Sequence, residues 1–149
     1  MAYITELHIE GELSYAIETT TQPTTAEVGD VISDVESEVN GRLYSVGVSV
    51  SGLDATTTPI AWRVVKQIVL WGVCSRVIAA AGGLIRAQTG KEKDYWDRYE
   101  AKLKAIEKDP RILGSDTPFL TSASDLEFSY ITSGDDEYYG PVFRTRDEF

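Results

Sequence analysis

The chain has 149 residues, 42% of them hydrophobic and 26% charged, a length that suits one ordinary globular domain and excludes a large multidomain enzyme. Its 24 acidic residues outnumber its 14 basic ones, and the net charge of −10 argues against a nucleic-acid grip, which needs clustered lysines and arginines. With one cysteine, Cys74, and one histidine, His8, an internal disulfide and a zinc cluster of the usual spacing are both excluded.

The first two predicted elements are helices. Thr5 can cap a short one, whose apolar positions are only loosely periodic (Leu7, Leu13, Ala16 and Ile17). A capping box of Thr24 and Glu27 begins the second, which we expect over residues 24–41 with a stop at Asn40–Gly41. The apolar positions of this second helix fall on one stripe: Val28, Val31, Ile32, Val35, Val39 and Leu43.

A strand and the longest helix follow. Residues 44–50 alternate between apolar and small polar side chains, which predicts a half-buried β-strand in need of a partner. Thr58 and Pro59 predict the start of a helix over residues 59–88. That helix is apolar on most sides and should be the central one, with small residues such as Gly72 allowing a close approach. Arg76 interrupts its apolar window, so we expect no membrane span, and the N-terminus lacks the pattern of a secretory signal.

The last helix and the C-terminal segment differ sharply in character. Residues 91–109 predict a helix that packs on the central one through a stripe of Trp96, Tyr99, Leu103 and Ile106. Residues 110–149 lack a helical period but hold seven of the fifteen aromatic residues, which predicts an arm that orders on a partner. Phe128 and Tyr130 alternate with polar residues, so they could pair with the 44–50 strand, within the chain or from a neighbour.

These elements together predict a mainly α fold. We expect a small antiparallel-type helical bundle around a long central helix over residues 1–109, with a short β-strand or hairpin. Residues 110–149 would form an extended C-terminal arm. Charge is uneven along this arrangement, because residues 1–60, 61–109 and 110–149 carry net charges of −9, +4 and −5. The basic surplus therefore lies in the middle.

Catalytic chemistry finds little support in the sequence. Cys74 lies within an apolar helix, as a buried structural thiol would, and His8 lies in the weak first helix. The acidic run at residues 135–137 lacks the alternating ligands of a calcium loop and reads as a solvated turn. We expect no catalytic residue, cofactor or metal.

Four features recur in one family: the capped Tyr3-x-Thr5 opening, the start of an acidic helix at residues 23–27 with its end at 39–43, the Pro59 helix start, and a final aromatic, charged helix. In this order, over residues 1–109, the chain resembles the head–tail connector proteins of long-tailed bacteriophages, also called adaptor or head-completion proteins. The resemblance implies a non-enzymatic virion protein of the neck, assembled in the host cytoplasm. It would form a homo-oligomeric ring, usually of twelve copies, between the portal protein and a stopper or tail-completion protein. DNA would pass through the ring without specific binding.

The resemblance also implies roles for three sets of residues. An acidic face would line the channel or meet a neighbouring subunit (Glu27, Asp30, Asp34 and Glu38). A basic face would meet the acids of the next copy (Lys91, Lys93, Arg98, Lys102 and Lys104). The arm would dock on the portal through aromatic and arginine anchors (Tyr138, Tyr139, Phe143, Arg144, Arg146 and Phe149).

Two other classes of function stay open on the sequence. The net charge suits an acidic DNA-mimic inhibitor of a nucleic-acid-binding enzyme, although the net positive middle third breaks a continuous phosphate-like surface. A small enzyme would have to use Cys74 and His8.

Overall fold

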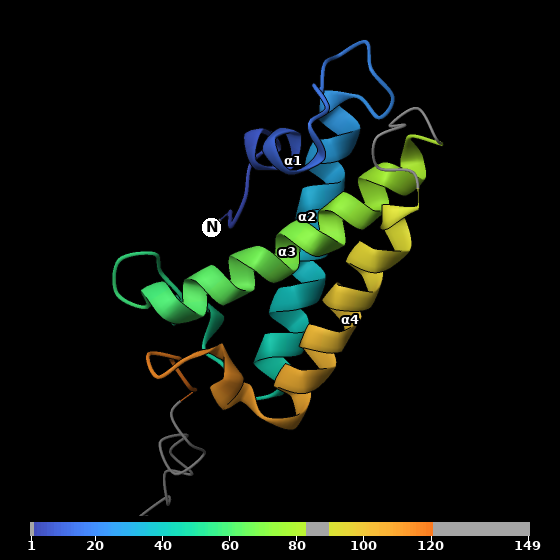
Figure 1. The fold of residues 1–149 in the computed structure, drawn as a ribbon. Coiled ribbons are helices and arrows are strands. Elements are labelled where there is room, and N and C mark those ends of the chain that lie inside the picture. Colours follow the sequence, from blue (N-terminus) through green and yellow to red (C-terminus); the bar gives the residue numbers. More distant parts are fainter. Residues whose placement is uncertain (1, 83–89, 121–149) are drawn as a thin grey trace, which may run out of the picture.

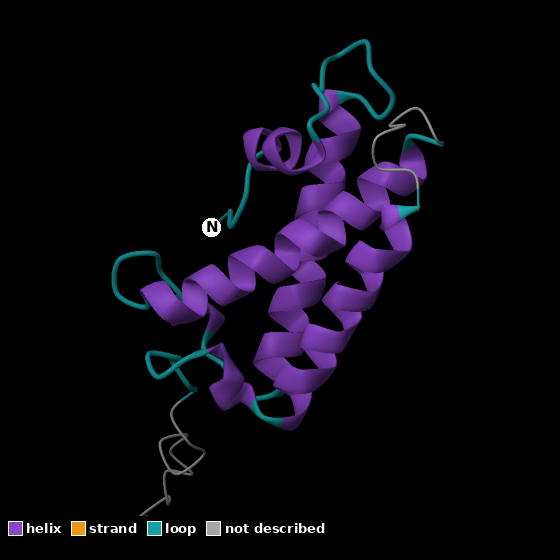
Figure 2. Cartoon of the chain, in the orientation of Figure 1, coloured by secondary structure: helices purple, strands orange, loops and turns teal. Residues whose placement is uncertain are grey.

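The computed structural model describes residues 2–82 and 90–120, and this part of the chain is mainly helical, as predicted. Figures 1 and 2 show its four α-helices and the short 3₁₀ turns between and after them. The elements in chain order are α1 (Glu6–Leu13), α2 (Thr25–Ser45), η1 (Val50–Gly52), α3 (Pro59–Ala80), α4 (Lys91–Lys108) and η3 (Pro110–Leu113).

Helix α3 is the centre of the fold, as its apolar sequence predicts. It packs against α1, α2, α4 and η3, and in Figure 1 it crosses α2 and runs in the direction opposite to α2 and α4. Its buried side chains face several directions, as expected for a helix whose apolar residues do not fall on one stripe. Gly72 lies at a close contact with α2 and α4, because a methyl group there would come 2.8 Å from Cε2 of Tyr99 and 2.9 Å from Cγ1 of Val35.

Helix α2 begins as predicted but does not stop at Asn40–Gly41. The Thr24–Glu27 capping box is present, with the Thr24 backbone N–H donating to Oε2 of Glu27 at 2.7 Å. The helix continues to Ser45 because its last turn carries Leu43, which is fully buried, and Arg42, which bonds to α4. The predicted stripe is confirmed, with Val31 partly buried and the other five residues buried.

Helix α1 is capped at Thr5 as expected but is shorter than its apolar residues suggested. It ends at Leu13, after which Ser14 takes the left-handed conformation (φ 50°), so Ala16 and Ile17 lie beyond it. Leu7 is 76% exposed, and Ile9 is buried with Leu13 instead. The weak periodicity therefore placed the helix but not its buried face.

The prediction of a strand over residues 44–50 is wrong. Tyr44 and Ser45 belong to α2, and Val50 begins η1. Val48 forms a single antiparallel bridge with Phe119, flanked by hydrogen bonds of 2.7 Å from Ser49 N to Pro118 O and from Leu120 N to Gly47 O. The alternation cannot extend into a strand because helix α2 occupies its first residues. Phe128 and Tyr130, the other predicted partners, lie outside the described residues.

The boundaries and the buried face of the last two helices need correction. Helix α3 starts at Pro59 as predicted but ends at Ala80, and the rest of the predicted 59–88 helix reaches residues outside the described range. In α4, Tyr99, Leu103 and Ile106 are buried as expected. Trp96 is 39% exposed, however, and Tyr95 is buried in its place, because the spacing 95, 99, 103 and 106 fits the helical period equally well.

Residues 110–120 pack on the helices, so the folded part of the chain continues beyond the predicted boundary at residue 109. Leu113 is fully buried, and Asp116 accepts hydrogen bonds from the backbone N–H groups of Ile60 (2.8 Å) and Ala61 (2.9 Å) at the start of α3. Thr58 holds the N-cap position of α3 but does not cap it, because its hydroxyl is bonded to the Asp54 backbone instead.

Candidate interaction surfaces

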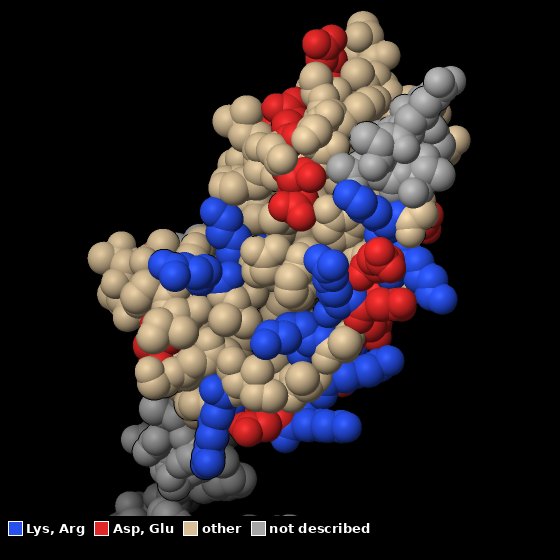
Figure 3. All heavy atoms as spheres, in the orientation of Figure 1, with Lys and Arg blue, Asp and Glu red and all other residues tan. Residues whose placement is uncertain are grey.

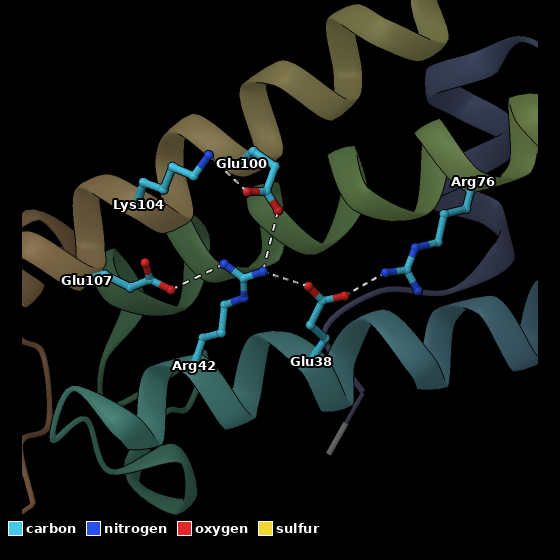
Figure 4. A network of polar contacts seen from close by, with 6 residues as sticks. All are labelled: Glu38, Arg42, Arg76, Glu100, Lys104 and Glu107. Atoms are coloured by element: carbon cyan, nitrogen blue, oxygen red, sulfur yellow. Dashed lines mark hydrogen bonds and ion pairs between the residues drawn. The ribbon is translucent and has the colours of Figure 1, made fainter.

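A network of ion pairs joins α2, α3 and α4. Arg42 of α2 contacts Glu38 of the same helix at 3.1 Å, and Glu100 and Glu107 of α4 at 3.5 and 3.2 Å. Figure 4 shows that Glu38 also reaches Arg76 of α3, while Lys104 contacts Glu100 at 3.4 Å. These contacts link the three long helices.

Electrostatics within the network follow from partial burial. Burial alone would lower the pKa of Arg42, but the negative charges of Glu100, Glu38 and Glu107 outweigh it and raise that pKa. Burial raises the pKa of Tyr99 beside the network, and the charge of Glu38 adds to this shift. The Tyr99 hydroxyl is buried without a hydrogen-bond partner among the described residues.

The four residues of the predicted acidic face have three different surroundings. Glu38 is bound to Arg42 and Arg76 within the chain, and Glu27 caps α2. The backbone and side chain of Thr24 lower the pKa of Glu27 by hydrogen bonding. Asp30 and Asp34, one turn apart on α2, are exposed and have no ion-pair partner among the described residues. Of the four, Asp30 and Asp34 are therefore the ones whose carboxylates take no part in a contact of the described chain.

The predicted basic face lies along α4. Lys91, Lys93 and Arg98 are exposed without an ion-pair partner in the described part of the chain, whereas Lys104 is paired with Glu100 and Lys102 is partly buried. Figure 3 shows basic side chains gathered over α3 and α4, with acidic side chains between them on α4. The surface of α4 is thus mixed in sign, with three free bases in its first half.

Exposed apolar side chains concentrate at the end of the molecule where α2 finishes and α3 begins. Most of the large hydrophobic residues that the structure leaves exposed lie there: Tyr44 (65%), Ile60 (52%), Phe119 (46%), Ile112 (41%) and Leu120 (38%). Figure 1 places the end of α2, the start of α3 and η3 together at the lower left. An apolar patch of this kind is a common mark of an interaction surface.

A solvent-open groove of about 420 Å³ lies beside this patch. Tyr3 and Asn40 line it, with the Tyr3 hydroxyl donating to Oδ1 of Asn40 at 2.8 Å. The remaining lining residues are Tyr44, Ser49, Val50, Ser51 and Leu120. A groove of this size suits a short stretch of side chains.

The residues that an enzyme would need are poorly placed for catalysis. Cys74 is fully buried, and burial, aided by the charge of Glu12, raises the pKa of its thiol to about 12, so it stays protonated. His8 lies on α1, where its ring nitrogens contact Thr5 and the Lys66 ammonium. Within residues 2–82 and 90–120, no cluster of three or more His, Cys, Asp or Glu side chains could hold a metal ion.

The six residues predicted to dock on the portal all lie outside the described residues. Among the helices that the structure describes, none combines the length and apolar character that a membrane span requires. No family model, curated protein or solved structure matches the chain.

Sequence reasoning did not find three features of these surfaces. The role of Arg42 could have been suspected from the sequence, since it is the only basic residue among the first sixty and follows Glu38 by one helical turn. The capping role of Asp116 could not have been suspected, because Asp116 follows Ile60 and Ala61 by more than fifty positions in the chain. The groove brings together residues from Tyr3 to Leu120, and no local pattern marks such a site.

Proposed function

We propose that this chain is a structural virion protein, a head–tail connector that forms a ring between the portal and the stopper or tail-completion protein. The subunit would be a small antiparallel helical bundle around α3, and twelve copies would extend the DNA channel. The protein would act without catalysis. The resemblance over residues 1–109 supplies this class of function.

The observation that carries the proposal is the arrangement of free charge on a helical body. Asp30 and Asp34 project from α2, and Lys91, Lys93 and Arg98 from α4, and none of them has an ion-pair partner within the described chain. A ring repeats one head-to-tail contact, so the acids of one copy can meet the bases of the next. Complementary charges of this kind select the correct partner and orientation.

The charge balance also suits a channel. A net charge of −10 repels phosphate backbones, and exposed carboxylates on a channel wall would keep DNA from adhering as it passes. The ion pairs of Glu38 remove it from this role, which leaves Asp30 and Asp34 as the acids that would face DNA or a neighbour.

Charge exchange tests the ring contact. The protein would be mixed with the portal protein of the same virus, and ring formation measured by sedimentation and negative-stain microscopy. Asp30→Lys with Asp34→Lys, or Lys91→Glu with Lys93→Glu, should each weaken assembly about tenfold or more, because like charges then face each other across the interface. All four changes together should restore it. Glu6→Lys with Glu18→Lys makes the same charge change on another part of the surface and should leave assembly unchanged.

The same assay tests the arm. Deleting residues 134–149 should abolish binding to the portal while the helical circular dichroism spectrum is kept, because the predicted anchors are removed. Assembly of the shortened chain at the normal level would contradict the arm assignment. A chain that never forms rings with the portal, and instead competes with DNA for a DNA-binding enzyme, would favour the DNA-mimic function.

A further inference from the structure

One side of the groove between α2 and the 118–120 segment, formed by Tyr3, is preformed. The Tyr3 backbone N–H donates to Oε1 of Glu36 at 2.6 Å, and its hydroxyl donates to Asn40. Its ring also packs against Trp62, with 4.7 Å between the ring centroids. Tyr3 is only 5% exposed, so these contacts hold its ring in one position. Binding of a ligand would therefore lose little conformational entropy on this side of the groove.

The lining of the groove is uncharged but able to form hydrogen bonds. None of its seven lining residues carries a charge. The side-chain nitrogen of Asn40 has no hydrogen-bond partner among the described residues, because its oxygen takes the Tyr3 contact. The exposed ring of Tyr44 adds an apolar rim. This surface suits an aromatic, uncharged stretch of polypeptide, whereas a charged one would lose hydration without compensation.

The described chain ends at this groove. The antiparallel bridge between Val48 and Phe119 sets the direction of residues 118–120, which run from beside Ser49 toward Gly47 and the end of α2. Leu120, the last described residue, itself lines the groove. Residues 121–149 therefore begin at its rim.

The C-terminal arm contains one stretch that matches the groove. Residues 128–134 include Phe128, Tyr130 and Ile131 and carry no charge, whereas residues 135–149 contain five acids and two arginines. Seven residues lie between Leu120 and Phe128. The eight steps along the chain can span up to roughly 26 Å, which is more than the distance needed to return to a groove that Leu120 itself lines. A tether this short gives the chain's own segment a high effective concentration over any competitor.

We propose that the groove binds residues 128–134 of the same chain. The arm is then divided into an inner, uncharged part held against the helical body and an outer, charged part of residues 135–149 left for a partner. This binding does not depend on ring formation.

Paramagnetic broadening in the isolated full-length protein tests the proposal. A nitroxide would be attached at Ser51→Cys, an exposed residue of the groove, while the buried Cys74 stays unlabelled. The amide signals of residues 128–134 should lose more than about half of their intensity, and those of residues 140–149 should keep most of theirs. A nitroxide at Lys93→Cys, near the opposite end of the long helices, should leave both sets unchanged.

Two further samples separate the alternatives. Tyr44→Ala should restore the signals of residues 128–134, whereas Ile112→Ala, an exposed residue of the same end that does not line the groove, should not. A mixture of labelled chain and isotope-enriched unlabelled chain should show no broadening. Full signal intensity with the Ser51 label, or equal broadening by both labels, would overturn the proposal. Broadening that persists in the mixture would assign the groove to the arm of a neighbouring copy. Because no portal is present, failure here would leave the proposed function untouched.

Discussion

At the scale of single residues, Arg42 shows how an isolated charge is used in packing. It is the only base among the first sixty residues, and it turns toward three carboxylates on α2 and α4. A single guanidinium can serve several acceptors because its donors form a planar fork. Part of the negative charge of residues 1–60, that of Glu38, is therefore neutralised by ion pairs within the fold.

Two glycines in helices should respond oppositely to the same substitution. Gly72→Ala places a methyl group within 3 Å of Tyr99 and Val35, and should lower the free energy of unfolding by about 1–3 kcal/mol. Gly41→Ala meets no atom within 4 Å in the second-last turn of α2, and should raise that free energy by about 0.5–1 kcal/mol by restricting the unfolded chain. Urea denaturation of both variants measures the difference. A stabilising Gly72→Ala would show that α4 does not pack closely at this point.

At the scale of elements, the start of α3 depends on a residue far along the chain. Pro59 favours the first helical turn but provides no side-chain acceptor, and Thr58 is turned toward the Asp54 backbone. Asp116 fills the vacant role by accepting from Ile60 and Ala61. This contact also fixes the segment that leads to the groove, so one carboxylate ties the central helix to residues 114–120.

Removing the Asp116 cap should destabilise both the first turn of α3 and the segment that contains Asp116. Asp116→Ala should lower the free energy of unfolding by about 0.5–2 kcal/mol, as loss of an N-cap usually does, and should speed hydrogen exchange at the amides of Ile60 and Ala61. Asp116→Asn keeps an acceptor and should lose less. Asp97→Ala, at an exposed position within α4, serves as the control. Equal stability of the Asp116→Ala and Asp97→Ala variants would contradict the capping role.

At the scale of the whole molecule, buried tyrosines join the helices and make stability depend on alkaline pH. Burial, with the charge of Glu36, raises the pKa of Tyr3 to about 12. Burial and a hydrogen bond to Glu12 raise that of Tyr95 to about 12 as well. Because the folded chain holds these protons more tightly than the unfolded chain, whose tyrosines titrate near pH 10, the phenols favour folding fully below that pH.

The contribution of these two tyrosines to the free energy of unfolding should accordingly be constant below about pH 10 and fall as pH rises toward about 12. Urea midpoints across this range would measure the slope. Tyr3→Phe should reduce the slope, although it also removes the hydrogen bond to Asn40. An identical slope in the Tyr3→Phe variant would mean that Tyr3 does not contribute.

Local patterns predicted most of the helices but not their surroundings. The Thr24–Glu27 box, the Pro59 start and the stripe from Val28 to Leu43 depend on residues within a few turns, and all three are confirmed. The strand at 44–50 and the stop at Gly41 failed because burial of Leu43 and the contacts of Arg42 with α4 outweigh local preference. For the candidate interaction surfaces, the sequence named both the acids and bases that turn out to be unpaired in the described chain and those that are paired. It did not distinguish the two groups, because Glu38 and Lys104 form their ion pairs only in the folded chain.

The sequence by itself determined the helical class, the starts of the helices and the central place of α3, because capping and apolar periodicity act between neighbouring residues. Only the tertiary structure decided which charges are free and which are paired. It also decided that Tyr95 rather than Trp96 enters the core, and that Tyr3, Tyr44 and Leu120 share a groove. These outcomes depend on contacts between residues far apart in the chain, and such contacts produce no pattern among neighbouring residues of the sequence.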